Sequence, residues 1–268
     1  MTIWLNGRLL PAAEARIDPA DRGFTLGDGL FETIRVKDGV PRHLTRHFDR
    51  LASGTALLRL PLPYDAAAMS EAMMALIEAT SLTDGVLRLT LSRGTGARGV
   101  LPPPDARPTA LMTVAPAAHM TAPVAAVIAR STRRNEHSPL SRLKSLNYLD
   151  SILARQEAAE RGADEALLLN GAGRLAESSI ANLFLSVGGR LLTPPVADGA
   201  LPGIRRALIL ERHGAAEAPL TPDDFARADE AILTNSLGLR PLLSVDGTPV
   251  GNGTAGPVLA RLLADPDL

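Results

Sequence analysis

Hydrophobic and polar residues alternate along several short stretches of this chain, with the period of two that is typical of β-strands. The clearest stretch is 30–36, where the alternation places Phe31, Thr33 and Arg35 on one face and Glu32, Ile34 and Val36 on the other. Similar patterns predict strands at 86–92, 111–115, 124–129, 165–169, 181–187 and 230–234. Helical spacing is found instead at 43–58, 65–80 and 147–161.

Sequences typical of turns and linkers separate these predicted strands and helices. Asn6-Gly7 and Asp246-Gly247 predict hairpins, and Leu201-Pro202-Gly203 predicts the start of a helix that ends near Arg212. A proline- and alanine-rich segment at 116–123 reads as a linker. Because strands and helices are mixed without strict alternation, we expect an α+β fold with two domains, 1–118 and 119–268.

The composition is that of a globular protein, and it excludes several classes of function. Of the 268 residues, 46% are hydrophobic and 21% are charged, and the formal net charge of -1 provides no basic field for nucleic acid. There is no cysteine, which excludes disulfides and thiolate metal ligands, and no metal site is predicted. The N-terminal residues lack the pattern of a signal peptide, and no apolar run approaches the roughly 20 residues of a membrane span. A cytoplasmic protein is expected.

Lysine is nearly absent from the sequence. Lys37 and Lys144 are the two lysines among 28 basic residues, so the other 26 are arginines. Lys37 belongs to a Lys-Asp-Gly turn signal, whereas Lys144 precedes the helix predicted at 147–161. Unlike arginine, lysine can lose its proton and form a Schiff base with a carbonyl group. Lys144 is therefore a candidate nucleophile, although a lone lysine is more often simply solvated.

Two further features could serve a phosphorylated, electrophilic cofactor together with Lys144. The helix start at Gly203-Ile204-Arg205, with the hydroxyl of Ser236, could bind a phosphate. Glu177, in a polar cluster between strand patterns, could pair with a protonated ring nitrogen. Each signal is weak alone, because such a helix start or glutamate is usually structural. The loop at 93–99, which combines glycines with arginines, is either a long hairpin connection or an anion-binding loop.

Taken together, the motifs resemble the class-IV aminotransferase family over essentially the whole chain. They are Asp21-Arg22-Gly23, Gly27-Asp28-Gly29-Leu30-Phe31-Glu32, Lys144-Ser145-Leu146-Asn147-Tyr148-Leu149, Glu177 to Phe184, Leu201-Pro202-Gly203-Ile204 and Thr234-Asn235-Ser236. The family includes branched-chain and D-amino-acid transaminases, R-selective amine transaminases and aminodeoxychorismate lyase. The resemblance implies the fold-type IV architecture, in which a small N-terminal and a larger C-terminal α+β domain hold pyridoxal 5′-phosphate between them. It also implies a homodimer.

The resemblance also implies a role for each matching residue. Lys144 would form the Schiff base with the cofactor and carry the proton, Glu177 would pair with the ring nitrogen, and Tyr148 would lie near the phenolic oxygen. The phosphate ligands implied are Arg50, Ile204, Arg205 and Ser236, and the substrate-binding residues implied are Phe31, Arg35 and Arg98. Arg205 departs from the threonine that many members have at its position.

Transamination, with an amino donor and a 2-oxo acid as substrates, is the predicted reaction. The segment 144–149, residues 154–158 and Glu32 favour it. The alternative is 4-amino-4-deoxychorismate lyase, which the short chain and the segments 92–99 and 134–137 favour. Val100 stands where D-amino-acid transaminases typically have a histidine, which argues against a strict D-amino-acid specificity. An alternative of another class is a non-catalytic α+β binding protein in which Lys144 is merely solvated.

Overall fold

The computed structural model describes residues 1–116 and 121–268, and it has the mixed α and β composition that the sequence predicts. The boundary expected between residues 118 and 119 lies outside the described residues. The described chain divides into two compact units, and the first contains 1–116 together with Lys144–Asn147. The residues on either side of Lys144–Asn147 group with the second unit. None of the helices among the described residues has the length and the apolar composition of a membrane span.

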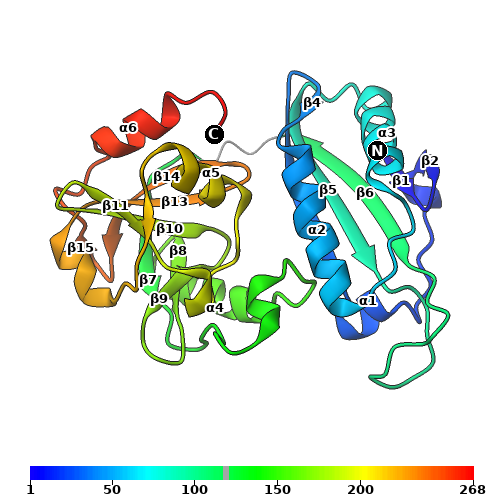
Figure 1. The fold of residues 1–268 in the computed structure, drawn as a ribbon, viewed down its shortest axis with the longest axis horizontal. Helices are drawn as coiled ribbons and strands as arrows, with labels where there is room; N and C mark the ends of the chain where they lie inside the picture. The colour runs from blue at the N-terminus through cyan, green and yellow to red at the C-terminus, as the bar shows by residue number, and fades with distance from the viewer. Residues whose placement is uncertain (117–120) are drawn as a thin grey trace. The chain divides into compact units, whose positions relative to one another are not determined.

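The first unit is an antiparallel sheet covered by two helices on one face (Figure 1). Its strand order is β2-β1-β6-β5-β3-β4. The elements are β1 (Thr2–Leu5), β2 (Arg8–Pro11), α1 (Arg22–Leu26), β3 (Gly29–Lys37), β4 (Val40–Pro41), α2 (Leu44–Leu58), α3 (Ala66–Ala79), β5 (Asp84–Ser92) and β6 (Thr109–Pro116). The hairpin around Asn6-Gly7 and the helices predicted at 43–58 and 65–80 are confirmed.

The two faces predicted for 30–36 are those of β3. Glu32, Ile34 and Val36 are buried, and α2 packs against this strand. The same face continues through the buried leucines of β5, because Ile34 pairs with Leu87 in the antiparallel register. The opposite face of the sheet carries Phe31, Thr33 and Arg35.

A short helix, α1, lies in the glycine-rich segment before β3, where the sequence predicts no helix. The Asp21 side chain accepts a hydrogen bond from the backbone N–H of Gly23 and caps the helix start, and Gly27 ends the helix in the left-handed conformation with φ +65°. Five residues are too few for a helical hydrophobic period to show, so only the two caps could have indicated it.

The second unit is built on a mixed sheet with the order β12-β11-β10-β13-β14-β7-β8-β9, and β15 pairs with β14. Its elements are β7 (Val124–Ile128), α4 (Leu149–Glu160), β8 (Glu165–Leu169), β9 (Leu175–Ser178), β10 (Asn182–Val187), β11 (Arg190–Thr193), α5 (Ile204–Arg212), β12 (Ala216–Glu217), β13 (Ala228–Asn235), β14 (Gly238–Val245), β15 (Thr248–Pro249) and α6 (Pro257–Leu263). The hairpin predicted around Asp246-Gly247 is present, and the helix α6, which the sequence did not predict, follows it.

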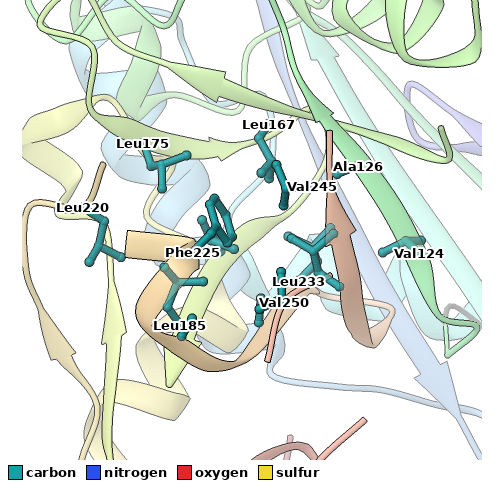
Figure 2. Close-up of a cluster of buried hydrophobic side chains, with 14 of the residues drawn as sticks. Val124, Ala126, Leu167, Leu175, Leu185, Leu220, Phe225, Leu233, Val245 and Val250 are labelled. Carbon is teal, nitrogen blue, oxygen red and sulfur yellow. The ribbon is translucent and has the colours of Figure 1, made fainter. Parts of the chain in front are cut away.

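Buried aliphatic side chains and one aromatic ring form the largest core cluster of this unit (Figure 2). Phe225 lies among leucines and valines that come from strands far apart in the sequence, such as Leu167 on β8 and Leu233 on β13. Burial of these side chains supplies the main driving force for the fold of this unit. The sheet built on this core places Glu177 on β9 and the Ser236-Leu237 turn directly after β13.

Candidate functional site

Lys144 is held against the start of β3 by backbone hydrogen bonds within the first unit. The Phe31 N–H donates to the Lys144 carbonyl at 2.9 Å, and the Leu146 N–H donates to the Gly29 carbonyl at 3.0 Å. The Lys144 Nζ lies 4.4 Å from the centre of the Phe31 ring, and the residue is half-buried. The predicted nucleophile and the predicted substrate-binding ring are therefore in contact.

Arg88 shares the same aromatic ring, and no pattern in the sequence predicted it. Its guanidinium carbon lies 3.8 Å from the centre of the Phe31 ring, while its Nε donates to the Thr90 hydroxyl at 3.3 Å. In the register, Arg88 pairs with Thr33, two residues from Phe31 and on the same face of the sheet. Only the pairing of β3 with β5 reveals this proximity, because the two residues are far apart in sequence.

Arg50, the predicted phosphate ligand, lies on α2 and forms a bidentate ion pair with Glu32. Its Nε and Nη2 donate to the two carboxylate oxygens at 2.9 and 2.6 Å, and the Nδ1 of His47 lies 2.6 Å from Oε2. Burial by itself raises the pKa of the Glu32 carboxyl. The charge of Arg50 and the hydrogen bonds from His47 and Arg50 outweigh burial and lower this pKa to about 2. Glu32 therefore stays ionised and fixes the direction of the Arg50 guanidinium.

The other two predicted arginines of this unit are in different surroundings. The Nη2 of Arg35 lies 2.7 Å from the Asp84 carboxylate, and Nη1 donates to the Gly85 carbonyl at 2.9 Å, so its guanidinium is tied to the start of β5. Arg98 is exposed in the loop between β5 and β6. Both arginines belong to the first unit, as Lys144 and Phe31 do.

Glu177 lies on β9, a strand where the sequence predicted only a polar segment between strands. Its side chain is mostly buried, and its carboxylate is 3.1 Å from the Nε of Arg134. The other oxygen accepts from the Leu201 N–H at 3.0 Å and from the Asn182 side chain at 3.4 Å. Arg134 and Asn182 thus orient the predicted partner of the ring nitrogen, and neither was predicted to do so.

Asn182 also connects Glu177 to the start of α5. Its Nδ2 donates to the Leu201 carbonyl at 2.9 Å, and its Oδ1 would lie 2.0 Å from a Cβ placed on Gly203. Only glycine therefore fits at the position that precedes Ile204, the first residue of α5. Ile204 and Arg205 begin this helix, at the place where the backbone N–H groups of a first helical turn can bind an anion.

The last predicted residues of the second unit follow from the sheet and from α4. Asn182 pairs with Thr234 in the β10–β13 register, and Ser236 begins the two-residue turn that leads from β13 to β14. Glu177, the start of α5 and the turn with Ser236 are thus joined through Asn182 and its strand neighbours. Tyr148 precedes α4 and is half-buried.

Comparisons with known proteins identify the family. The family model "Amino-transferase class IV" matches residues 29–245. A putative branched-chain-amino-acid aminotransferase of Methanocaldococcus jannaschii is 33% identical, over 98% of this chain and 94% of the relative. Two solved structures are similar over nearly their whole length. The T.th. branched-chain amino acid aminotransferase with pyridoxamine 5′-phosphate has a TM-score of 0.91 at 27% identity, covering 97% of this chain and 91% of that one.

The second structure is the 4-amino-4-deoxychorismate lyase of Pseudomonas aeruginosa, with a TM-score of 0.84 at 35% identity, covering 99% of this chain and 100% of that one. The predicted fold-type IV architecture is therefore confirmed. The family match spans the strand that contacts Lys144, the lysine itself and the whole Glu177–Ser236 arrangement. The chain belongs to the class IV aminotransferase family.

Proposed function

We propose that this protein is a pyridoxal 5′-phosphate-dependent transaminase that moves an amino group between an amino acid or amine and a 2-oxo acid. The observation that carries the proposal is the position of Lys144 in a chain of this family. Its Nζ lies against Phe31, on a backbone that is hydrogen-bonded to β3. The adjacent Ser145 is buried as well, so the backbone beside Lys144 is held within the first unit.

The residues present fit the cofactor. Lys144 provides an amine, Glu177 a mostly buried and oriented carboxylate, and Gly203 a helix start that tolerates no side chain. When bound, pyridoxal phosphate supplies an electron sink for the electrons left at the substrate carbon after deprotonation. Glu177 would hold the proton on the ring nitrogen, and Arg50, Ile204, Arg205 and Ser236 would bind the phosphate. Lys144 would hold and return the proton that leaves the substrate carbon, with Tyr148 at the phenolic oxygen.

Arginines on the first unit would receive the substrate carboxylate. Arg98 is the leading candidate, since it is exposed, whereas the guanidinium of Arg35 is already paired with Asp84. Arg88 is a further candidate, because its guanidinium shares the Phe31 ring with Lys144. Phe31 would pack against the substrate.

The second candidate function is the lyase reaction, which releases pyruvate and 4-aminobenzoate from 4-amino-4-deoxychorismate. The P. aeruginosa lyase favours it, because that chain is matched over its entire length at 35% identity. The lyase reaction needs the same lysine and the same ring electronics, so the residues described above do not distinguish the two reactions.

The decisive experiment is a pair of assays on the purified protein with pyridoxal phosphate. In the first, a panel of L- and D-amino acids is mixed with 2-oxoglutarate, and glutamate formation is measured. In the second, 4-amino-4-deoxychorismate is supplied and 4-aminobenzoate is measured. If glutamate forms and the substitution Lys144→Arg abolishes its formation, the transaminase proposal is supported. If 4-aminobenzoate is released without any amino transfer, the protein is a lyase and the transaminase proposal is wrong. A protein that neither binds pyridoxal phosphate nor turns over would contradict both.

The proposal also includes a homodimer in the cytoplasm. Each subunit of this dimer would consist of the domains 1–118 and 119–268. The dimer is supported by exposed apolar side chains on the first unit, where Phe24 is 81% exposed beside an apolar cavity of about 450 Å³. The cytoplasmic location is supported by the absence of cysteine. The domain division is supported by the two compact units, with Lys144–Asn147 joining the first.

A further inference from the structure

Arg22 is a buried arginine whose motif, Asp21-Arg22-Gly23, has no part in the proposed chemistry. The residue is 3% exposed. Its Nε donates to Asp28 Oδ2 at 2.8 Å, and the Nε of Arg93 donates to the same oxygen at 2.8 Å. Burial raises the pKa of the Asp28 carboxyl, but these two guanidinium groups outweigh burial and hold the pKa below its usual range. Asp28 therefore remains a carboxylate that fixes the direction of Arg22.

The remaining donors of Arg22 bind the loop between β5 and β6. Its Nη1 donates to the Gly99 carbonyl at 2.8 Å and its Nη2 to the Val100 carbonyl at 2.9 Å. The planar guanidinium can bind two successive carbonyls while Nε stays on Asp28, which a single ammonium group could not do. Arg22 thus binds the chain directly after Arg98.

The ends of the same loop are fixed by Asp21. Its Oδ2 accepts from the Ser92 hydroxyl at 2.9 Å, at the end of β5, and from the Thr109 hydroxyl at 2.7 Å, at the start of β6. A Cβ on Gly94 would lie 1.8 Å from the Arg107 carbonyl, so the two arms of the loop approach closely. Asp21 therefore closes the base of the loop, and Arg22 determines the path of its middle.

We infer that Arg22 is a positioning residue for substrate, which holds the Gly99 and Val100 carbonyls and thereby determines where the loop presents Arg98. The inference rests on the proposed role of Arg98 as the carboxylate receptor. Without the Gly99 anchor, the exposed Arg98 would sample many positions, and binding would have to restore the order at an entropic cost. The chemical step at Lys144 would be unaffected.

The anchoring is tested first without substrate, by limited trypsin digestion. Trypsin cuts after arginine but not before proline, so the loop offers the Arg98–Gly99 bond and not the Arg107–Pro108 bond, while Arg93 is buried. In Arg22→Met, cleavage after Arg98 should be on the order of tenfold faster than in the parent chain, because cleavage requires local opening. Mass spectrometry of fragments 1–98 and 99–268 identifies the cut.

Arg93→Met is the matched control. Arg93 is equally buried and binds the same Asp28 oxygen, but its Nη1 and Nη2 donate to the Arg59 and Leu58 carbonyls at the end of α2. Cleavage after Arg98 should remain close to the parent rate in this variant. Equal acceleration in both variants would overturn the inference, since the loop would then respond to general destabilisation. If Arg22→Met does not fold, Arg22→Lys keeps a charge for Asp28 but cannot hold both carbonyls, and the same comparison applies.

The positioning role is then tested by kinetics with an amino acid substrate. Arg22→Met should raise KM roughly tenfold with kcat within about twofold, because ground-state binding is lost while the reacting groups are intact. The double variant Arg22→Met/Arg98→Met should be no worse than Arg98→Met alone, since Arg22 acts through Arg98. Additive losses, or a fall in kcat alone, would overturn the inference. If the parent protein itself has no activity, the proposed function is contradicted. The trypsin experiment then still shows whether Arg22 anchors the loop.

Discussion

At the scale of single residues, the two lysines provide an internal comparison. Arginine at position 144 can keep a cation over the Phe31 ring but cannot form a Schiff base, so Lys144→Arg should lower activity by on the order of 10²- to 10⁴-fold or more. Lys37→Arg, at the exposed last residue of β3, should leave activity unchanged. Borohydride reduction with pyridoxal phosphate, followed by peptide mapping, should label Lys144; label on other residues, or none, would contradict the assignment.

A second residue, Glu32, links the fold to pH. The pKa of its carboxyl is about 2 in the folded chain, against an ordinary value of 4.5. The contribution of the ionised Glu32 to the free energy of unfolding is therefore complete above pH 4.5 and is lost as the pH falls toward 2. The shift corresponds to about 3 kcal/mol at neutral pH. Glu32→Gln should therefore lower the free energy of unfolding most near neutral pH, and less in acid.

Urea unfolding at several pH values measures this difference. Glu71→Gln, at an exposed position on α3, is the matched control and should show little change at any pH. An equal effect of Glu32→Gln at all pH values would show that the lost packing, and not the ionised carboxylate, is responsible.

At the scale of elements, the start of α5 depends on a glycine. Gly203→Ala places a Cβ about 2.0 Å from the Asn182 Oδ1, and Asn182 is buried and held by Leu201, so it cannot move aside easily. Overpacking of this kind costs about 1–3 kcal/mol, and it should also weaken pyridoxal phosphate binding. Removing the amide in Gly203→Ala/Asn182→Ala should make the glycine substitution less costly than in the parent background. Thermal melts and cofactor titration measure both effects; strictly additive losses would contradict the clash.

The strands β3 and β9 and the helix α6 show how far the sequence predicts the fold. The alternation at 30–36 placed Glu32 on the buried face of β3, because period-two patterns depend only on local geometry. The sequence did not predict the strand β9, because its four residues include the polar Glu177 and Ser178. Both are buried, with hydrogen-bond or ion-pair partners in Arg134, Leu201 and Ala181. α6 was missed because only seven residues carry its pattern.

The residues of the candidate site likewise fall into those whose roles the sequence predicts and those whose roles it does not. Motif matches indicated the roles of Lys144, Glu177 and Ser236. The matching segments also contain Arg134, Asn182 and Arg22, but the sequence predicted no role for these residues, because they act through contacts whose partners lie up to 78 positions away. Such contacts arise from tertiary register, which periodicity in one segment does not encode.

At the scale of the whole molecule, the exposed apolar residues of the first unit bear on assembly. Phe24 and Ile17 are 81% and 46% exposed, and both line the cavity of about 450 Å³ together with Leu111 and Leu146. A monomer with such a patch would expose it to water, whereas a two-fold dimer would bury each Phe24. Burial of one phenylalanine contributes about 1.5–3 kcal/mol, so two copies contribute about 3–6 kcal/mol.

Phe24→Asp should therefore weaken the dimer by on the order of 10²- to 10⁴-fold, which sedimentation velocity across a range of protein concentrations would show as a shift toward monomer. Val40→Asp is the matched control, since Val40 is 51% exposed on the same unit but does not line the cavity. That variant should sediment as the parent does. A parent chain that is monomeric at micromolar concentration would remove the dimer proposal, and unchanged association of Phe24→Asp would place the interface on another surface.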